Sequence, residues 1–347
     1  MCSPSGSNPG KPSFLSNAVR GSAAVLPPLI IAGPTAAGKS QLGLALAARL
    51  GGEIVVADSM QVYRGLDIGT NKPSQAERRA VPHHLVDICE PHDSFSAFAF
   101  AEAAATAIHA IQRRGGFPIL VGGTGLYLRA FLKGQLAGGG RDAELRERLQ
   151  AEAARDGVPA LYARLRTLDP LSAETIRPGD LVRIVRALEV WEGTGRPPSE
   201  LRPDLWDAPQ VALSGFLVLT RPREELAELI ERRSARMWEA GLLDEVRGLV
   251  AAGVAPDARS LQSIGYRQAV AVLAGRLNLA EAQRDLVRAT RQYAKRQLTW
   301  FRREPAAEWI SASGAAWLEP LVEQLAFRLM ASTQAGTGAQ LDAGGER

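Results

Sequence analysis

Cysteine is rare in this chain, which has two, Cys2 and Cys89, among its 347 residues. They match neither a disulfide framework nor the spacing of a metal site, so we expect a reducing compartment and a structural role for Cys89. Long apolar runs are also missing. No stretch approaches the length that a membrane-spanning helix needs, so we expect no membrane partner.

Acidic residues are absent from residues 1–26, which are rich in Ser, Pro, Gly and Asn. Such a composition cannot bury a core, so we expect a disordered N-terminal tail. An organellar transit peptide is the alternative, because these peptides also lack acidic residues, but the segment shows little amphipathic periodicity. Gln, Gly, Thr and Ala dominate residues 332–347, and we expect a second disordered tail there.

Between the tails, the composition suits a globular protein. Hydrophobic residues make up 46% of the chain, which is ample for a buried core, and the length suggests two compact units. The formal net charge of +4 hints at a polyanionic partner. A charge this small is weak evidence until its distribution along the chain is considered.

The segment Gly33–Ser40 carries glycine, lysine and serine at the spacing of a phosphate-binding P-loop. The apolar run Leu29–Ala32 precedes it and the helix-like Gln41–Leu50 follows, so it joins a strand to a helix. Backbone N–H groups and the helix N-terminus would face an anion there. The candidate phosphate ligands are Gly33, Pro34, Thr35, Ala36, Ala37, Gly38, Lys39 and Ser40. The motif leaves open whether the phosphate is fuel, is transferred or is expelled.

Further apolar strands alternate with helical patterns. Glu53–Ala57 ends at Asp58, and Phe117–Val121 ends at a glycine-rich turn that contains Thr124, with a helical pattern over Phe98–Arg114 between them. This alternation predicts an α/β fold, a P-loop NTPase-like parallel sheet with helices on both faces. Ligands bind beyond the carboxyl ends of such strands, so the P-loop, Asp58 and Thr124 should meet at one place.

The glycines at 138–140 interrupt this pattern, and residues 141–194 read as almost wholly helical. A strand at Ser214–Thr220 then returns the chain to the sheet. We therefore expect a catalytic core of residues 27–138 and 200–312 with an all-helical subdomain, residues 139–199, inserted into it. Later helices are expected at about 223–240, 243–252 and 280–303.

The last of these helices carries a basic face. Arg284, Arg288, Arg291 and Lys295 fall on one side, and aromatic residues are interleaved with them. Cations for phosphates and flat rings for unstacked bases are typical of a nucleic-acid surface. The alternative is a solvated helix whose aromatic side chains pack inward, and this pattern alone does not decide between them.

Asp58 also allows two interpretations. A carboxylate at a strand end beside a P-loop commonly helps to hold Mg²⁺ in kinases and nucleotidases. It could instead be a general base that faces an incoming nucleophile.

The segment Ala57–Pro73 resembles the tRNA dimethylallyltransferases, also called isopentenyl-tRNA transferases. The resemblance runs from the P-loop to about Arg303 and is specific because several blocks match in order: Val81–Asp87, Gly122–Tyr127, Asp180–Val190, Ser263–Arg267 and Thr290–Trp300. Eukaryotic relatives often add a C-terminal zinc finger whose ligands are missing here, so the resemblance indicates a bacterial-type enzyme of the cytoplasm.

The resemblance implies that the dimethylallyl group of dimethylallyl diphosphate passes to the exocyclic amine of the adenine 3′ to the tRNA anticodon. Asp58 would be the base that takes a proton from this poor nucleophile. Lys39, the P-loop amides and Mg²⁺ held through Ser40 would stabilise the departing diphosphate. The resemblance assigns Arg233 to the diphosphate, with Arg223 as a lesser candidate. Many relatives carry an arginine where this chain has Leu229.

The resemblance also implies tRNA contacts. Thr124 would bond the target base or its backbone, and Ser59, Met60 and Gln61 would lie beside the base with Asp58. The base must leave the stack to reach a strand-end carboxylate. Further contacts would come from Arg146 and from three blocks: Val182, Arg183, Ile184, Val185 and Arg186; Gln262, Ser263, Ile264, Gly265, Tyr266 and Arg267; and Lys295, Arg296, Gln297, Leu298, Thr299, Trp300, Phe301 and Arg302.

His83 and His84 are adjacent and have no third ligand at a useful spacing, so we interpret them as structural. Two other functions share some of these features. A P-loop kinase would use the cradle, Mg²⁺ and Asp58 but not a basic helical face. An RNA-binding NTPase would use the basic helix but not the Asp58 segment. We expect a monomer.

Overall fold

The computed structural model describes residues 26–133, 142–201 and 211–341. Its centre is a six-stranded parallel sheet in the order β3-β2-β4-β1-β5-β6. The strands are β1 (Leu29–Ala32), β2 (Gly52–Ala57), β3 (His83–His84), β4 (Phe117–Gly122), β5 (Gly215–Thr220) and β6 (Glu308–Ser311). The predicted α/β fold is confirmed.

Alternating side chains of the central strands feed two separate cores. Ile30 of β1 and Val55 of β2 point to the face covered by α3 (Ala97–Arg113) and α4 (Gly125–Leu132). Ile31 and Ile54 point to the opposite face, which α1 (Lys39–Leu50) and α14 (Leu318–Leu341) cover. The period of two in a strand explains why each strand is apolar on both sides.

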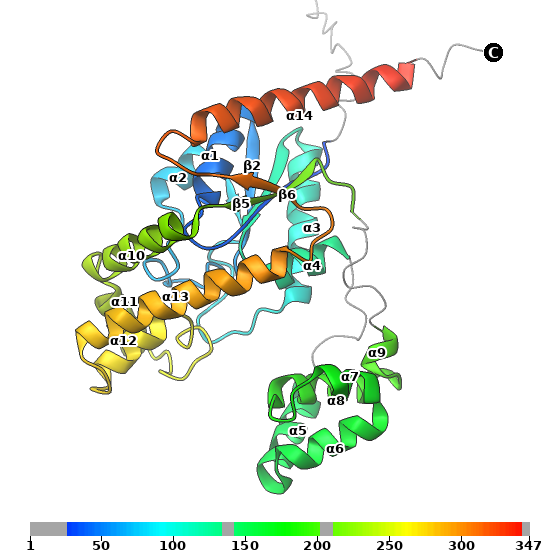
Figure 1. Cartoon of the computed structure of the whole chain (residues 1–347), viewed down its shortest axis with the longest axis vertical. Helices are drawn as coiled ribbons and strands as arrows, with labels where there is room; N and C mark the ends of the chain where they lie inside the picture. The colour runs from blue at the N-terminus through cyan, green and yellow to red at the C-terminus, as the bar shows by residue number, and fades with distance from the viewer. Residues whose placement is uncertain (1–25, 134–141, 202–210, 342–347) are drawn as a thin grey trace, which may run out of the picture.

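Helices that follow β5 form a third packed group, at the left of Figure 1. They are α10 (Arg223–Glu239), α11 (Leu242–Ala251), α12 (Tyr266–Leu273) and α13 (Leu279–Phe301). Val62, Tyr63 and Leu66, from the loop after β2, are buried among them. The small helix α2 (Gln75–Ala80) lies later in the same β2–β3 connection. This packing fixes the loop that begins at Asp58.

The inserted segment is helical, as expected, and appears in green at the lower right of Figure 1. Its helices are α5 (Ala143–Asp156), α6 (Val158–Leu168), α7 (Pro170–Thr175), α8 (Leu181–Thr194) and α9 (Pro198–Leu201). Leu149, Leu161, Leu165 and Leu188 form a core of its own. The expected boundary at residue 139 lies outside the described residues, and α9 continues past 199.

Three elements differ from the sequence expectations. β3 has two residues, and β6 is mostly exposed, so neither shows an apolar strand pattern. The expected C-terminal tail from residue 332 is wrong as far as Leu341, because α14 continues to that residue. Leu325 and Leu329 anchor this helix in the sheet core, and it continues from there to Leu341. Residues 1–25 and 342–347 of the expected tails lie outside the described residues.

No helix in the described ranges is long and apolar enough to cross a bilayer.

Candidate active site

The P-loop follows β1 directly and turns through several residues with positive φ. Gly33 has φ 137°, and a Cβ there would lie 2.5 Å from the Leu219 carbonyl oxygen, so the adjacent strand β5 leaves room only for glycine. Gly38 has φ 104° and stands where a side chain would collide with the Trp317 ring. Ala36 also has a positive φ, 65°. The loop therefore has a fixed shape before any ligand binds.

Lys39 lies in this loop, where burial disfavours its protonated, positively charged form. Its Nζ donates a hydrogen bond to the Pro34 carbonyl oxygen at 2.8 Å. Burial and then the positive charge of Arg233 lower the pKa of Lys39, Asp58 works in the opposite direction, and the net value is about 7. An arriving anion would supply the negative charge that favours the protonated amine.

The three strand ends meet as expected. Lys39, Asp58 and Arg233 line one small cavity of about 100 Å³, together with Thr35, Ser40, Gln61, Gly122, Gly123, Tyr293 and Gln297. Asp58 follows β2, and its Oδ1 accepts from the Met60 amide at 2.8 Å. No described residue donates a hydrogen bond to Oδ2. The carboxylate is thus fixed through one oxygen, and the other is open to a ligand.

Thr124 connects two of these strand ends. Its amide donates to the Ala57 carbonyl oxygen at 3.3 Å, and its Oγ1 accepts from the Ser59 amide at 3.1 Å. These bonds place the turn after β4 against the residue that follows Asp58. Thr124 therefore fixes the local backbone around the carboxylate.

Arg233 and Arg223 have different surroundings. Arg233, in the middle of α10, lines the cavity, and its Nη2 donates to the Thr70 carbonyl oxygen at 3.3 Å. Burial lowers its pKa, and Asp58 opposes that effect. Arg223 is the exposed first residue of α10 and does not line the cavity. Arg221 instead contacts the P-loop: its Nε donates to the Ala37 carbonyl oxygen at 3.1 Å and its guanidinium lies over Trp317.

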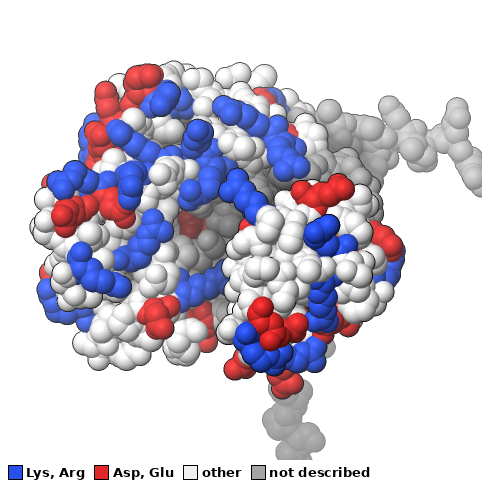
Figure 2. Space-filling view, turned by 60° about the horizontal axis from the view of Figure 1, so that its bottom comes forward, with Lys and Arg blue, Asp and Glu red and all other residues white. Residues whose placement is uncertain are grey.

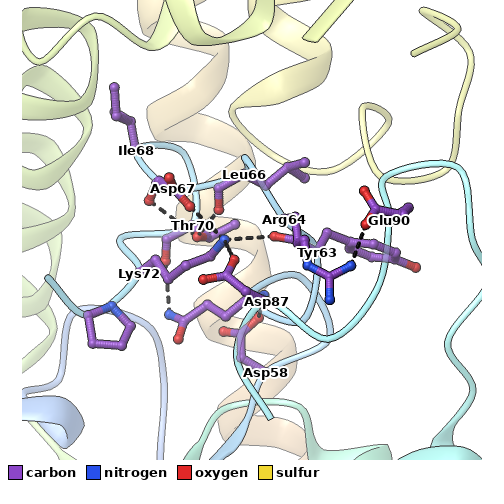
Figure 3. A network of polar contacts seen from close by, with 12 residues as sticks. Asp58, Tyr63, Arg64, Leu66, Asp67, Ile68, Thr70, Lys72, Asp87 and Glu90 are labelled. Carbon is purple, nitrogen blue, oxygen red and sulfur yellow. Dashed lines mark hydrogen bonds and ion pairs between the residues drawn. The ribbon is translucent and has the colours of Figure 1, made fainter. Parts of the chain in front are cut away.

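Lys72 organises the loop that carries Asp58 (Figure 3). Its side chain is 2% exposed, and Nζ contacts carboxylate oxygens of Asp67 and Asp87 at 2.6 Å each and the Tyr63 carbonyl oxygen at 2.7 Å. Burial works to raise the pKa of Asp87, but hydrogen bonds from Lys72 and Arg78 outweigh it and hold that pKa below its usual value. The loop closes around one buried ammonium group.

Glu245 of α11 holds the far side of the same loop. Its carboxylate accepts from the amides of Asp67 at 3.1 Å, Ile68 at 2.8 Å and Gly69 at 3.4 Å. It also accepts from the Tyr266 hydroxyl at 2.5 Å. Burial, and then the nearby negative charge of Glu245, raise the pKa of Tyr266. The chain from Asp58 to Lys72 is thereby attached to α11 and α12.

Comparisons with known proteins agree on one family. A family model described as IPP transferase matches residues 61–304. The tRNA dimethylallyltransferase of Anaeromyxobacter dehalogenans is 52% identical over 290 residues, 82% of this chain and 94% of that protein. That of Geobacter metallireducens is 51% identical over 82% of this chain and 93% of its own length. The chain belongs to the tRNA dimethylallyltransferase family.

Solved structures of the tRNA dimethylallyltransferase family have the same fold. The tRNA isopentenylpyrophosphate transferase of Bacillus halodurans aligns with a TM-score of 0.65 at 38% identity, covering 90% of this chain and 99% of its own. A eukaryotic dimethylallyltransferase captured acting on tRNA aligns with a TM-score of 0.73 at 29% identity, covering 86% of this chain and 77% of its own.

The blocks expected to contact tRNA contain both buried and exposed residues. Five of their side chains are buried and pack inside the protein: Ile184, Val185, Tyr266, Gln297 and Phe301. Gly265 is buried too. The exposed members are Val182, Arg183, Gln262, Arg267, Lys295, Arg296, Thr299 and Arg302, whereas Ser263, Ile264, Leu298 and Trp300 are partly buried. Only the accessible positions can present a side chain to RNA in this conformation.

Two arginines expected to contact RNA are engaged within the inserted helices. Arg146 and Arg186 both pair with Glu189, whose side chain is 2% exposed. Neutralising this buried carboxylate is therefore a structural role for both. Arg183, on the exposed side of α8, pairs with Asp180 at the helix start and is the more accessible cation.

The basic face of α13 is present as predicted, because Arg284, Arg288, Arg291 and Lys295 are all exposed. The three arginines line a groove of about 620 Å³ between α10 and α13. Arg288 pairs with Asp285 and Arg291 with Glu231, so part of the charge is balanced. Figure 2 shows Lys and Arg side chains across the larger body and beside the hollow that separates it from the smaller one.

Sequence reasoning missed the support residues of the site. Arg221, Glu245 and the bridging role of Gln297 depend on contacts between segments far apart in the chain, such as Gln297 with Thr35. No local pattern identifies such partners. Lys72 instead contacts Asp67 and Asp87 nearby in the chain. The one available signal for Lys72 is its position inside the block Ala57–Pro73 that carries the family resemblance.

Proposed function

We propose that this chain transfers the dimethylallyl group from dimethylallyl diphosphate to the exocyclic N6 amine of the adenine 3′-adjacent to the tRNA anticodon. The observation that carries the proposal is the cavity where Lys39, Arg233 and Asp58 meet in a member of the tRNA dimethylallyltransferase family. Two cations and the P-loop amides suit a diphosphate, and one carboxylate stands beside them to accept a proton.

The bond changes assign a separate task to each part of the cavity. The allylic C–O bond breaks, its electron pair leaves with the diphosphate, and the adenine N6 forms a bond to the allylic carbon. The N6 proton passes to the Asp58 carboxylate. Lys39 and Arg233 stabilise the negative charge on diphosphate, and burial strengthens this attraction because water does not screen it.

A divalent metal fits the same place, and we propose Mg²⁺. Ser40, the second residue of α1, lines the cavity together with Asp58, so oxygen donors of the kind that Mg²⁺ prefers stand beside the phosphate cradle. Mg²⁺ is usually held by one or two protein groups and by substrate phosphates. When bound, it would neutralise charge on the diphosphate.

The adenine would reach Asp58 by leaving its stack. Gln61, beside Asp58, carries an amide able to bond the polar edge of a base, and its Nε2 donates to the Thr70 carbonyl oxygen at 3.1 Å in this structure. The same carbonyl oxygen accepts from Arg233. The Thr70 carbonyl oxygen would thus hold both Gln61, which would bind the base, and Arg233, which would bind the diphosphate. Single-stranded anticodon loops permit the required base extrusion at low cost.

The decisive experiment supplies dimethylallyl diphosphate labelled in the dimethylallyl group, unmodified tRNA and Mg²⁺. We expect the label to appear on one anticodon-loop adenine, with release of one diphosphate per label. ATP replaces the labelled compound in a parallel reaction. ATP hydrolysis or phosphate transfer, without label in tRNA, would instead support a P-loop NTPase or kinase. We further propose that the protein is cytoplasmic and monomeric. Sedimentation of the purified protein checks the monomeric state.

A further inference from the structure

Gln297 uses both ends of its side-chain amide to connect three elements. It lies on α13 and is 6% exposed. Its Oε1 accepts from the Thr35 amide of the P-loop at 2.8 Å, and its Nε2 donates to the Gly123 carbonyl oxygen at 2.9 Å. The two partners lie at the ends of β1 and β4, so one side chain joins α13 to both strand ends.

The surroundings leave Gln297 little freedom. A Cβ at residue 123 would lie 2.2 Å from Nε2, so the close approach requires glycine there. One turn earlier on α13, Tyr293 lines the same cavity as Gln297. Burial and the Asp58 charge raise the pKa of Tyr293 to about 12, so this hydroxyl stays protonated at neutral pH. The Gln297 amide is therefore fixed at both ends.

Gln297 lies on the inner side of α13, next to residues that are exposed on its outer side. Lys295 and Arg296 directly precede it and are exposed, whereas Gln297 faces inward. A helix is rigid over one turn, so a shift or rotation of α13 that follows contact at its outer face also moves the Gln297 amide. The Thr35 N–H that this amide holds is one of the P-loop groups that face a diphosphate.

We propose that Gln297 is a positioning residue that couples tRNA binding at the outer face of α13 to diphosphate binding at the P-loop. The proposal rests on the proposed function and adds that the two substrates bind cooperatively through this side chain. Coupling of this kind typically changes affinity by roughly 5- to 150-fold, and it is reciprocal between the two ligands.

The test measures binding of a non-reactive thio analogue of dimethylallyl diphosphate, with and without a saturating anticodon stem-loop RNA. In the unaltered protein, we expect the RNA to lower the analogue Kd by at least about fivefold. In Gln297→Met, which fills similar space without the hydrogen bonds, this ratio should fall close to one. The Kd for RNA measured without analogue should stay within about twofold. If Gln297→Met does not fold, Gln297→Leu replaces it, because it also removes both hydrogen bonds.

Gln112→Leu is the matched control, because Gln112 also donates a side-chain hydrogen bond to a carbonyl, that of Leu26, which precedes β1, whereas the P-loop follows this strand. Its coupling ratio should equal that of the unaltered protein. An unchanged ratio in the Gln297 variant, or a ratio of one in the unaltered protein, would overturn the proposal. Failure of the unaltered protein to bind RNA or analogue at all would count against the proposed function instead.

Discussion

At the scale of single residues, Asp58 is the carboxylate of the cavity whose role can be tested most directly. One oxygen is held by the Met60 amide, so replacing the carboxylate by an amide should preserve the local backbone. We expect Asp58→Asn to lower kcat about 10²- to 10⁴-fold, the usual contribution of a general base, while the tRNA Kd changes little. Steady-state transfer of labelled dimethylallyl groups measures the first quantity, and filter binding the second.

Asp257→Asn serves as the control for that measurement, because Asp257 is an exposed aspartate without a described ion pair. Its turnover should equal that of the unaltered protein. Near-normal turnover in Asp58→Asn would exclude Asp58 as the base and would leave it the role of a metal ligand.

Lys39 gives diphosphate binding a distinctive pH dependence. Because its pKa in the unliganded protein is about 7, a substantial fraction of the amine is neutral at pH 7.5 to 8. An anion binds the protonated form, so affinity should fall as pH rises through 7 and binding should take up a proton. Calorimetry of diphosphate binding in buffers with different ionisation enthalpies measures this uptake.

Lys39→Gln separates that effect from titration of the ligand itself. The ligand's own protonation is common to both proteins, so the difference in proton uptake near pH 7 to 8 reports Lys39. Equal uptake by the two proteins would mean that the lysine does not change its protonation when diphosphate binds, which would contradict the prediction.

At the scale of elements, the loop between β2 and α2 depends on a buried cation. Lys72→Met would leave Asp87 with one cationic partner and Asp67 with none among those that the structure shows. Removing one member of a buried pair costs about 3–5 kcal/mol. Asp67 is largely exposed, so we expect a smaller loss, about 2–3 kcal/mol of unfolding free energy. Urea unfolding measures the loss.

Arg247→Met is the matched control, since Arg247 pairs with Asp244 at the surface, where such pairs contribute about 0–1 kcal/mol. We also expect Lys72→Met to raise the KM for tRNA, because the same loop supports Gln61 through the Thr70 carbonyl. A variant as stable as the unaltered protein would show that backbone packing alone holds the loop.

The elements also show how far sequence patterns reach. Apolar runs and the P-loop spacing predicted β1, β2, β4 and β5, and the convergence of Lys39, Asp58 and Thr124 followed from parallel topology. The supports could not be predicted in this way. Gln297 and Thr35 are 262 residues apart, and Glu245 binds amides about 177 positions away. Their roles depend on tertiary contacts, and a repeating pattern does not encode these. For the same reason Gln297 was predicted as an RNA contact, although it faces inward.

At the scale of the whole molecule, two separately packed bodies both present accessible arginines and lysines. Arg183 lies on α8 of the inserted helices, with their own core, and Lys295 lies on α13 beside the sheet. If one tRNA contacts both bodies, each cation that neutralises a phosphate releases counterions on binding. The affinity of the protein for tRNA should then depend on salt through contributions from both bodies.

We therefore expect Lys295→Ala and Arg183→Ala each to lower the slope of log Kobs against log salt concentration by about one, and the double variant by about two. Titrations of unmodified tRNA at several salt concentrations measure these slopes, with Arg247→Ala as an exposed-arginine control. Effects that add in this way require a single RNA in contact with both bodies. A slope changed by Lys295→Ala but unaffected by Arg183→Ala would confine the RNA to the larger body, and the inserted helices would then need another role.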